Sequence, residues 1–450
     1  MSRRRTGGIW ASVSQTAVAK IVVMGLSGIL GIFTSRMIIE HFGAPAYAQY
    51  GLLTSIPALL PFADLGIAAV VINAIAGSDD PKRDLQVRRS IVTAFRILTV
   101  SGAIIMLVAV LITVLGLWPA ILGNGLMPDG GSIAAFLCLA TFGFVLPLTV
   151  GQRILIGVGK TSTQVATQAI AAPVIFLGVW LFVVADVDAG PYVSVLSYVA
   201  SGIVAAVCLW LSARSIRPQV WLAMKEVPRL RSAPGVPAFA LAWPMVVQMI
   251  ALPIAMQTDR LLLSHLTDGP ELAQYNLATQ LFGLVIQTIG AAGLALWPIY
   301  AKARSAKRVE SPLVPTLWFL GGGLALALIL ALISPWIAGF VSGGKITLGF
   351  PILIPYIVFV ALQAAKYPVG MYMTDQRGLQ FQVLPILCMV PLNLGLSWLL
   401  IPVFGAAGPI IGSAVSVAIC QVVPNLWYVQ RDLAKRRALA REEADVDATS

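Results

Sequence analysis

Two stretches of the chain are versions of one another: RMIIEHFGAPAYAQY at residues 36–50 and RLLLSHLTDGPELAQY at residues 260–275. Each begins with an arginine, has a histidine five residues later and closes on Ala-Gln-Tyr. The two histidines are the only ones in the protein. A second set of residues also repeats with unchanged spacing: Pro173, Trp180-Leu181 and Ala189-Gly190-Pro191 return as Pro391, Trp398-Leu399 and Ala407-Gly408-Pro409. The sequence therefore predicts two homologous halves.

The composition excludes a soluble globular protein. Hydrophobic residues make up 58% of the 450 residues and charged residues 11%, whereas about a quarter of a soluble domain is charged. Apolar runs of roughly 20 residues recur, each long enough to cross a ~30 Å hydrocarbon layer as a helix. The net charge of +11 comes from basic residues concentrated between these runs. Membrane orientation explains such residues better than nucleic-acid binding does, so no nucleic-acid partner is expected.

We predict an all-α integral membrane protein of about 12 transmembrane helices. The expected spans lie near 12–41, 47–76, 90–117, 132–156, 162–185 and 192–213 in the first half, and near 237–265, 271–300, 313–340, 348–372, 380–402 and 406–429 in the second. Lys and Arg gather at both ends of the chain and in alternate loops, which predicts cytoplasmic termini. Because each half has an even number of spans, two six-helix bundles should be related by a pseudo-two-fold axis along the membrane normal.

This topology predicts four segments along the chain. They are an N-terminal bundle at 1–213, a basic cytoplasmic linker at 214–236, a C-terminal bundle at 237–429 and a cytoplasmic tail at 430–450. The tail changes from basic to acidic, and we expect it to be a frayed, solvated end.

Basic residues inside the spans are candidates for contact with substrate, because charge is costly in hydrocarbon. Arg36 and Arg260 occupy equivalent positions near the outer ends of their helices. One interpretation is that both guanidinium groups snorkel to interfacial water or lipid phosphate. The other places both in a central cleft between the halves, where they would bind an anionic head group. Lys366 lies deeper, where it would attract phosphate in a cavity or pair with a carboxylate.

Acids and amides inside the spans are the remaining candidates. Asp64 and Asp259 are candidate ion-coupling carboxylates, although a helix-packing role is open for Asp64. Asn276, Gln280 and Gln287 share one helix face, which suits sugar hydroxyls but also suits hydrogen bonds between helices. His41 and His265 lie at helix ends, where an interfacial polar role is favoured over pH sensing.

The sequence contains no constellation that indicates an enzyme. It has no Walker A, GxSxG or HExxH motif, and we assign no catalytic residue. All four cysteines lie in apolar runs without ligand spacing, so neither a metal site nor a disulfide is expected. No cofactor is predicted, and without an ATP site active transport would draw on a gradient such as that of H⁺ or Na⁺ or on the substrate's own.

Four stretches carry a resemblance to a known family. They are residues 36–50, Asp64-Leu65-Gly66, residues 258–263 with Tyr275, and residues 393–416 with Ile401-Pro402 and Gly405-Ala406-Ala407-Gly408. In order and spacing they resemble the polysaccharide (O-antigen type) flippases of the multidrug/oligosaccharidyl-lipid/polysaccharide (MOP) exporter superfamily. The resemblance covers most of the chain, although each motif is degenerate.

The resemblance implies two MATE-like bundles around a cavity that opens alternately to each side. It implies a multi-pass protein of the bacterial cytoplasmic (inner) membrane that flips a polyprenyl-diphosphate-linked oligosaccharide to the outer leaflet for surface polysaccharide biosynthesis. Glycosyltransferases and a polysaccharide polymerase would then be its partners, beside membrane lipid. Arg36, Arg260 and Lys366 are the candidates for the diphosphate, and Asn276, Gln280 and Gln287 for sugar. An ion-coupled multidrug or small-metabolite antiporter of the same superfamily stays open, and an integral-membrane glycosyltransferase or polymerase is a third alternative.

Overall fold

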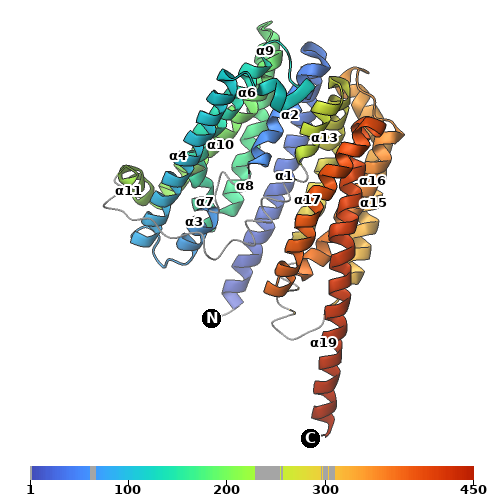
Figure 1. The fold of residues 1–450 in the computed structure, drawn as a ribbon. Coiled ribbons are helices and arrows are strands. Elements are labelled where there is room, and N and C mark those ends of the chain that lie inside the picture. The colour runs from blue at the N-terminus through green and yellow to red at the C-terminus, as the bar shows by residue number, and fades with distance from the viewer. Residues whose placement is uncertain are drawn as a thin grey trace. The chain divides into compact units, whose positions relative to one another are not determined.

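The structure is a computed structural model, and it describes residues 3–60, 67–228, 254, 257–294, 296, 300, 303 and 310–449. Every regular element in these ranges is helical (Figure 1). The chain forms two compact units, which are described separately below. Unit 1 comprises Met1–Val246 with Asp268–Ala273 and Phe340–Lys345, and unit 2 comprises Val247–Thr267, Gln274–Gly339 and Ile346–Ser450.

The helices of unit 1 are α1 (Arg3–His41), α2 (Gly43–Leu59), α3 (Ile67–Ala76), α4 (Leu85–Val114), α5 (Trp118–Leu122), α6 (Gly131–Val145), α7 (Val150–Gly157), α8 (Thr161–Thr167), α9 (Ala171–Val184), α10 (Val193–Ser215) and α11 (Gln219–Glu226). Short 3₁₀ turns join α6 to α7 at Leu146–Thr149 and α8 to α9 at Gln168–Ile170, so each pair forms one interrupted span.

The helices wholly or mainly in unit 2 are a helix over 257–266, α13 (Gly269–Leu294), α15 (Leu313–Ser342), α16 (Phe350–Tyr372), α17 (Gln376–Phe404), α18 (Gly408–Val417) and α19 (Val423–Thr449). A 3₁₀ turn at Gly405–Ala407 separates α17 from α18, and a π-helical turn at Ala418–Val422 joins α18 to α19.

Eight stretches of the described residues are long and apolar enough to cross a membrane. They cover the predicted first, third to sixth and ninth to twelfth spans. The last stretch, Arg377–Arg436, has 60 residues, far more than the ~20 that one crossing needs, and the turn at Gly405 divides it. The predicted second and seventh spans include residues 61–66 and 237–253, which lie outside the described residues, and α13 is helical over most of the eighth.

Helix α4 has one face that packs against the protein and another that is exposed and apolar. Its buried side chains include Val87, Ile91, Leu98, Ile105 and Ala109. Its exposed side chains form a stripe at helical spacing: Val100, Ile104, Leu107, Leu111 and Val114. An apolar stripe of this length is unfavourable in water and suits contact with lipid tails.

Two glycines allow α4 and α6 to pack closely. A Cβ atom added to Gly102 would lie 2.2 Å from the carbonyl oxygen of Gly143, and one added to Gly143 would lie 2.6 Å from that of Gly102. Close backbone approach through small residues is a common way of joining membrane helices. The two glycines therefore fix where these helices cross.

The repeated Ala-Gln-Tyr has a corresponding role in each half. The Gln49 amide donates to the carbonyl oxygen of Pro191 at 2.7 Å and accepts from the backbone N–H of Met127 at 2.7 Å. The Gln274 amide donates to the carbonyl oxygen of Thr347 at 2.5 Å. Met127 precedes the fourth predicted span and Thr347 precedes the tenth, so each glutamine fixes the corresponding loop.

The C-terminal tail differs from the expectation of a frayed end. Helix α19 continues to Thr449, and Figure 1 shows it extending past the other helices of its unit. The segment from Ala434 to Ala444 consists of Ala, Leu, Lys, Arg and Glu, which are strong helix formers. Helix propensity explains why α19 outlasts the apolar part of its sequence.

Candidate functional site: a buried carboxylate in unit 2

The centre of the site is Asp259, whose side chain is buried in unit 2 with 1% of its surface exposed. Ser397 donates a hydrogen bond to its Oδ1 atom at 3.0 Å, and Ser413 donates to Oδ2 at 3.0 Å. The Asn393 amide lies 3.5 Å from Oδ1, and the Tyr275 hydroxyl also hydrogen-bonds the carboxylate. Both carboxylate oxygens are thus satisfied by neutral groups.

Four helices bring these groups together: the helix over 257–266 carries Asp259, α13 carries Tyr275, and α17 and α18 carry the other donors. Asn393 and Ser397 are four residues apart on α17 and therefore share a face. Ser413 lies on α18, and its neighbour Ser416 donates to Oδ1 of Asn393 at 3.0 Å, which orients that amide. A Cβ atom at position 412 would lie 3.0 Å from the backbone nitrogen and Oγ of Ser397, so Gly412 allows α18 to approach α17.

The arrangement can hold a proton or a small hard cation. A charged carboxylate without water is costly unless it is hydrogen-bonded or neutralised. Its hydroxyl and amide partners can either donate to the carboxylate or, after reorientation, present oxygen lone pairs to a cation. Within the described residues no cluster of three or more His, Cys, Asp or Glu side chains could hold a metal ion. Because Asp259 supplies one negative charge and its partners are neutral, the site suits H⁺ or a monovalent cation such as Na⁺.

The corresponding positions of the first half lack this chemistry. Asp259 directly precedes Arg260, whereas Ser35 precedes Arg36. The spacing of the Trp-Leu and Ala-Gly-Pro repeats aligns Asn393, Ser397 and Ser413 with three apolar residues, Ile175, Val179 and Val195. Val179 is fully buried in unit 1. The two halves thus share the repeated residues, and only the second has a carboxylate and its donors at these positions.

Lys366, predicted to contact phosphate, lies half-buried on α16. Its Nζ atom donates to Oε1 of Gln421 at 3.0 Å, and Gln421 lies on the π-helical turn. The Gln421 amide also donates to the Met389 sulfur at 3.0 Å. Among the described residues no carboxylate lies within ion-pair distance of Lys366. Single π-helical turns within α-helices often occur at functional sites.

The two equivalent arginines have different surroundings. Arg36 forms an ion pair with Glu40, one turn later on α1, with Nε and Oε1 2.8 Å apart. The residue one turn after Arg260 is Ser264. Arg260 instead lies close enough to Tyr275 and Tyr356 to interact with them electrostatically. Glu40 thus has no acidic counterpart one turn after Arg260. In the second half the acid next to the arginine is Asp259, which directly precedes it and is buried.

The predicted amide stripe becomes more exposed along α13. Asn276 is buried, Gln280 is half-buried and Gln287 is exposed. The Thr279 and Tyr356 hydroxyls, 2.6 Å apart, link α13 to α16. The assignment of the three amides to sugar stays a prediction.

The two histidines make local backbone contacts. His41 and His265 are exposed, and each Nδ1 contacts the carbonyl oxygen four residues earlier, at 3.2 Å and 2.7 Å. Asp64 lies outside the described residues. Side chains that bond Asp259 or Lys366 but were not predicted as site residues from the sequence include Asn393, Ser397, Ser413 and Gln421. Asn393 and Ser397, four apart in an apolar run, were a usable signal.

Comparison with solved structures identifies the fold. The chain is similar to an inward-facing multidrug resistance MATE family transporter of the MOP superfamily, with a TM-score of 0.62 and 15% identity over 94% of this chain and 99% of that one. It is similar to the lipid II flippase MurJ in an inward closed conformation, with a TM-score of 0.67 and 14% identity over 93% of this chain and 90% of that one. A MOP superfamily transporter from Pyrococcus furiosus, described as having a binding pocket of reversed polarity, gives a TM-score of 0.53 and 15% identity over 95% and 96% of the two chains.

These similarities establish an all-α membrane fold of the MATE type. No protein-family model matches the sequence, and no curated protein matches it. The solved structures that it resembles are transporters and a flippase rather than enzymes.

Proposed function

We propose that this chain, which has the fold of MOP superfamily transporters, moves a polyprenyl-diphosphate-linked oligosaccharide from the cytoplasmic to the outer leaflet. The observation that carries the proposal is Lys366, a half-buried cation held by the Gln421 amide at 3.0 Å. Because the Gln421 amide is neutral, the charge of Lys366 is available to attract an anion. A diphosphate is such an anion, and its polyprenyl tail can stay in lipid while the head group crosses.

A similar fold in a lipid II flippase supports this substrate class, since the fold is compatible with the movement of a lipid-linked head group. Arg36, Arg260 and the amides of α13 stay proposed contacts for the diphosphate and sugar. We propose Asp259 as the coupling residue, because a buried carboxylate surrounded by hydroxyls can bind and release H⁺ or Na⁺ as the protein alternates between its two openings.

The test uses full-length protein in proteoliposomes that contain a polyprenyl-diphosphate-linked oligosaccharide with a fluorescent label on its sugar. A membrane-impermeant reductant bleaches the label that is exposed at the outer surface. Wild-type protein should make nearly all of the label accessible, whereas Lys366→Gln should slow this strongly. The control is Lys345→Gln, which makes the same change at a different lysine. The amine of Lys345 donates to the backbone carbonyl oxygen of Ile39 and is not a proposed substrate contact. If wild-type and protein-free vesicles bleach equally in every imposed ion gradient, the proposal is wrong.

A cation-coupled multidrug antiporter is the second candidate, and Asp259 is the observation that favours it. An acidic residue in the membrane suits exchange of H⁺ or Na⁺ for a cationic drug, and the MATE neighbours have the same fold. A strain that lacks the gene would then become sensitive to cationic drugs. The flippase proposal instead requires lipid-linked oligosaccharides to accumulate on the cytoplasmic face of that strain.

A further inference from the structure

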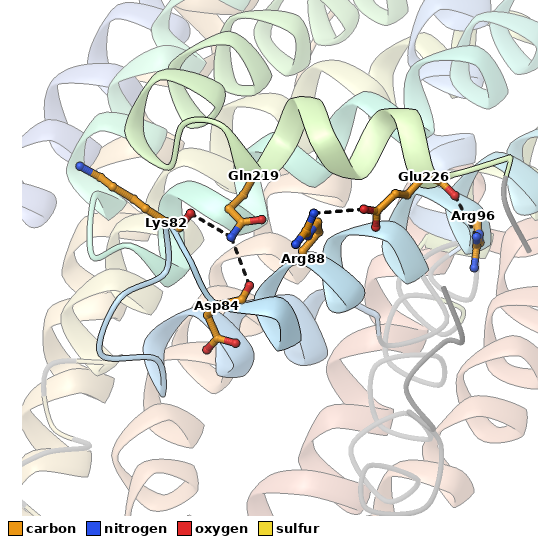
Figure 2. Close-up of polar contacts among 6 residues, drawn as sticks. All are labelled: Lys82, Asp84, Arg88, Arg96, Gln219 and Glu226. Atoms are coloured by element: carbon orange, nitrogen blue, oxygen red, sulfur yellow. Dashed lines mark hydrogen bonds and ion pairs between the residues drawn. The ribbon is translucent and has the colours of Figure 1, made fainter. Parts of the chain in front are cut away.

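Helix α11 is the first segment of the predicted linker, and it is fixed to the beginning of α4 (Figure 2). The Gln219 amide donates to the carbonyl oxygens of Lys82 and Asp84, at 2.9 Å and 3.2 Å. Arg88 on α4 forms an ion pair with Glu226, with Nη1 and Oε1 3.1 Å apart. These contacts hold the two ends of the eight-residue helix.

Arg96 completes the attachment at the C-terminal end of α11. Its Nε donates to the carbonyl oxygen of Val227 at 2.9 Å, and its Nη2 donates to that of Glu226 at 3.0 Å. The last carbonyls of a helix have no partner within the helix and carry its partial negative charge. A guanidinium group is therefore well suited to bind them, and Figure 2 shows Arg96 beside the end of α11.

The attachment leaves the opposite face of α11 uncovered. The buried residues of α11 are Gln219, Val220 and Ala223, which face the rest of unit 1. On the other face Trp221 is 63% exposed and Met224 43% exposed, with Lys225 beside them. A large indole ring and a thioether left uncovered on a rigidly attached helix need a partner other than water.

The aromatic and basic residues of α11 and of the adjoining segments indicate which partner fits. The Lys225 ammonium lies 5.6 Å from the Trp221 ring centroid, and the Arg214 guanidinium lies 3.7 Å from that of Trp210 on α10. Trp210 is exposed as well. Arg217, two residues before α11, is exposed, and so are Lys82, Arg83 and Arg89 in the segment to which α11 is attached. Exposed tryptophans among basic side chains are typical of the membrane–water interface, and the basic residues favour an acidic leaflet.

We propose that α11, Trp210 and the adjacent basic residues form a docking surface for the acidic head groups of the cytoplasmic leaflet. Trp221 and Met224 insert at head-group depth, while Lys225, Arg214 and Arg217 contact lipid phosphates. Arg88 and Arg96 hold α11 in the orientation that this contact needs. The partner is the lipid surface itself, so the proposal is independent of the transported substrate.

The test places full-length protein in nanodiscs and measures how brominated lipid quenches Trp221. The Trp221 signal is the fluorescence of the wild type minus that of Trp221→Phe. Two lipid mixtures have the same overall composition of phosphatidylglycerol and phosphatidylcholine, and the shallow bromines are carried by one lipid or the other. We expect a larger loss of the Trp221 signal when phosphatidylglycerol carries the bromines. Equal losses would refute the preference for acidic lipid, and no loss with either lipid would refute the membrane contact in favour of water or a protein partner.

A charge-reversed variant tests the cause of the preference. In Arg217→Glu/Lys225→Glu the excess loss with brominated phosphatidylglycerol should disappear. Both side chains are exposed, and neither makes the contacts that attach α11 to α4, so the attachment should stay intact. Trp398, an exposed residue of unit 2, is the control. Its signal is the fluorescence lost on adding Trp398→Phe to the wild type or to the charge-reversed variant, and its quenching should be the same in both. An excess loss that persists in a folded, monodisperse variant would overturn the assignment of the basic contacts.

Discussion

The hydroxyl group of Ser413 donates a hydrogen bond to Oδ2 of Asp259 at 3.0 Å, and this bond joins α18 to the helix over 257–266. Ser397 makes the corresponding bond to Oδ1 from α17. Both carboxylate oxygens thus bind hydroxyl groups from different helices. Any change in the charge of Asp259 therefore affects α17 and α18 together, which is the physical requirement for coupling ion binding to helix movement.

The Asp259→Asn variant should fold but lose coupled transport. The amide has the size of the carboxylate and can keep hydrogen bonds to the two serines, so we expect the stability to change by no more than about 1 kcal/mol. It can neither take up a proton nor neutralise a cation. Transport in proteoliposomes should no longer respond to an imposed H⁺ or Na⁺ gradient. The control is Ser334→Ala, which removes a buried serine that bonds within α15. A gradient response in Asp259→Asn equal to that of the wild type would contradict the coupling role.

Removing either hydroxyl partner should change ion binding without abolishing it, in a direction that distinguishes Na⁺ from H⁺. A hydrogen bond to a charged group contributes about 1.5–3 kcal/mol, which corresponds to roughly tenfold or more in a binding constant. For Na⁺, which the hydroxyl oxygens would coordinate, Ser397→Ala and Ser413→Ala should each raise the half-saturating concentration by about that factor. For H⁺ they should lower it, because the ion-free carboxylate loses a donor. The double variant should differ from the sum of the two, because both serines bind one carboxylate. Strict additivity would indicate that the serines act separately.

The crossing of α4 and α6 should not tolerate a side chain. Gly102→Ala places a Cβ atom 2.2 Å from the carbonyl oxygen of Gly143 in the present backbone, so the helices must separate. Overpacking of this kind costs about 1–3 kcal/mol. We expect a clear fall in the thermal midpoint of the detergent-purified protein. Gly25→Ala is the matched control, since no atom lies within 4 Å of its added Cβ. An equal effect of the two substitutions would show that helix propensity, not packing, is measured.

The Arg88–Glu226 pair should show charge dependence in a double-mutant cycle. Arg88→Glu and Glu226→Arg each place like charges together, and both should destabilise the attachment of α11. The exchanged double variant restores an opposite pair and should regain part of the loss. Because both side chains are partly exposed, the coupling free energy should be about 0.5–1 kcal/mol. It can be measured as protection of α11 from hydrogen exchange. Loss of protection in the exchanged variant equal to the sum of the single losses would exclude the ion pair.

The beginning of α4 should become less stable in acid because of Asp84. Its carboxylate accepts hydrogen bonds from the side chain of Ser78 and from the backbone N–H of Gln86, and these hold its pKa below the ordinary value of 3.8. A pKa that is lower in the folded state stabilises the fold above the unfolded value, and this contribution is lost as the pH falls through the folded value. At neutral pH Asp84→Ala should lose about 1 kcal/mol of N-cap stabilisation.

The pH dependence separates charge from capping in this variant. The difference in thermal midpoint between the wild type and Asp84→Ala should shrink as the pH falls below 3.8. Asp84→Asn keeps a capping oxygen without the charge, so its difference from Asp84→Ala should not depend on pH in this range. A wild-type advantage over Asp84→Ala that stays constant into strong acid would contradict the lowered pKa.

Some groups of the candidate site could be predicted from local pattern, and others could not. The costly position of Asp259 and Lys366 in apolar spans was enough to identify them as candidates. Their partners were not predictable in the same way. Serine, asparagine and glutamine are common in membrane helices, and only the packing shows which of them face a charged side chain. Gln421, which accepts a hydrogen bond from Lys366, lies 55 positions later in the sequence. It is part of a π-helical turn that no residue pattern indicated.

The sequence by itself determined that the chain crosses a membrane as helices, and it shows that residues of the first half recur with the same spacing in the second. Hydrophobic run length and residue spacing are local properties, and they depend only on the lipid thickness and on internal repetition. The tertiary structure alone decided that Arg260 lies beside Tyr275 and Tyr356, which are 15 or more residues away along the chain. It also decided that Asp259 receives its hydrogen bonds from three other helices, α13, α17 and α18. Those outcomes depend on which helix faces pack together, and close approach at glycines such as Gly412 sets that packing over long sequence separations.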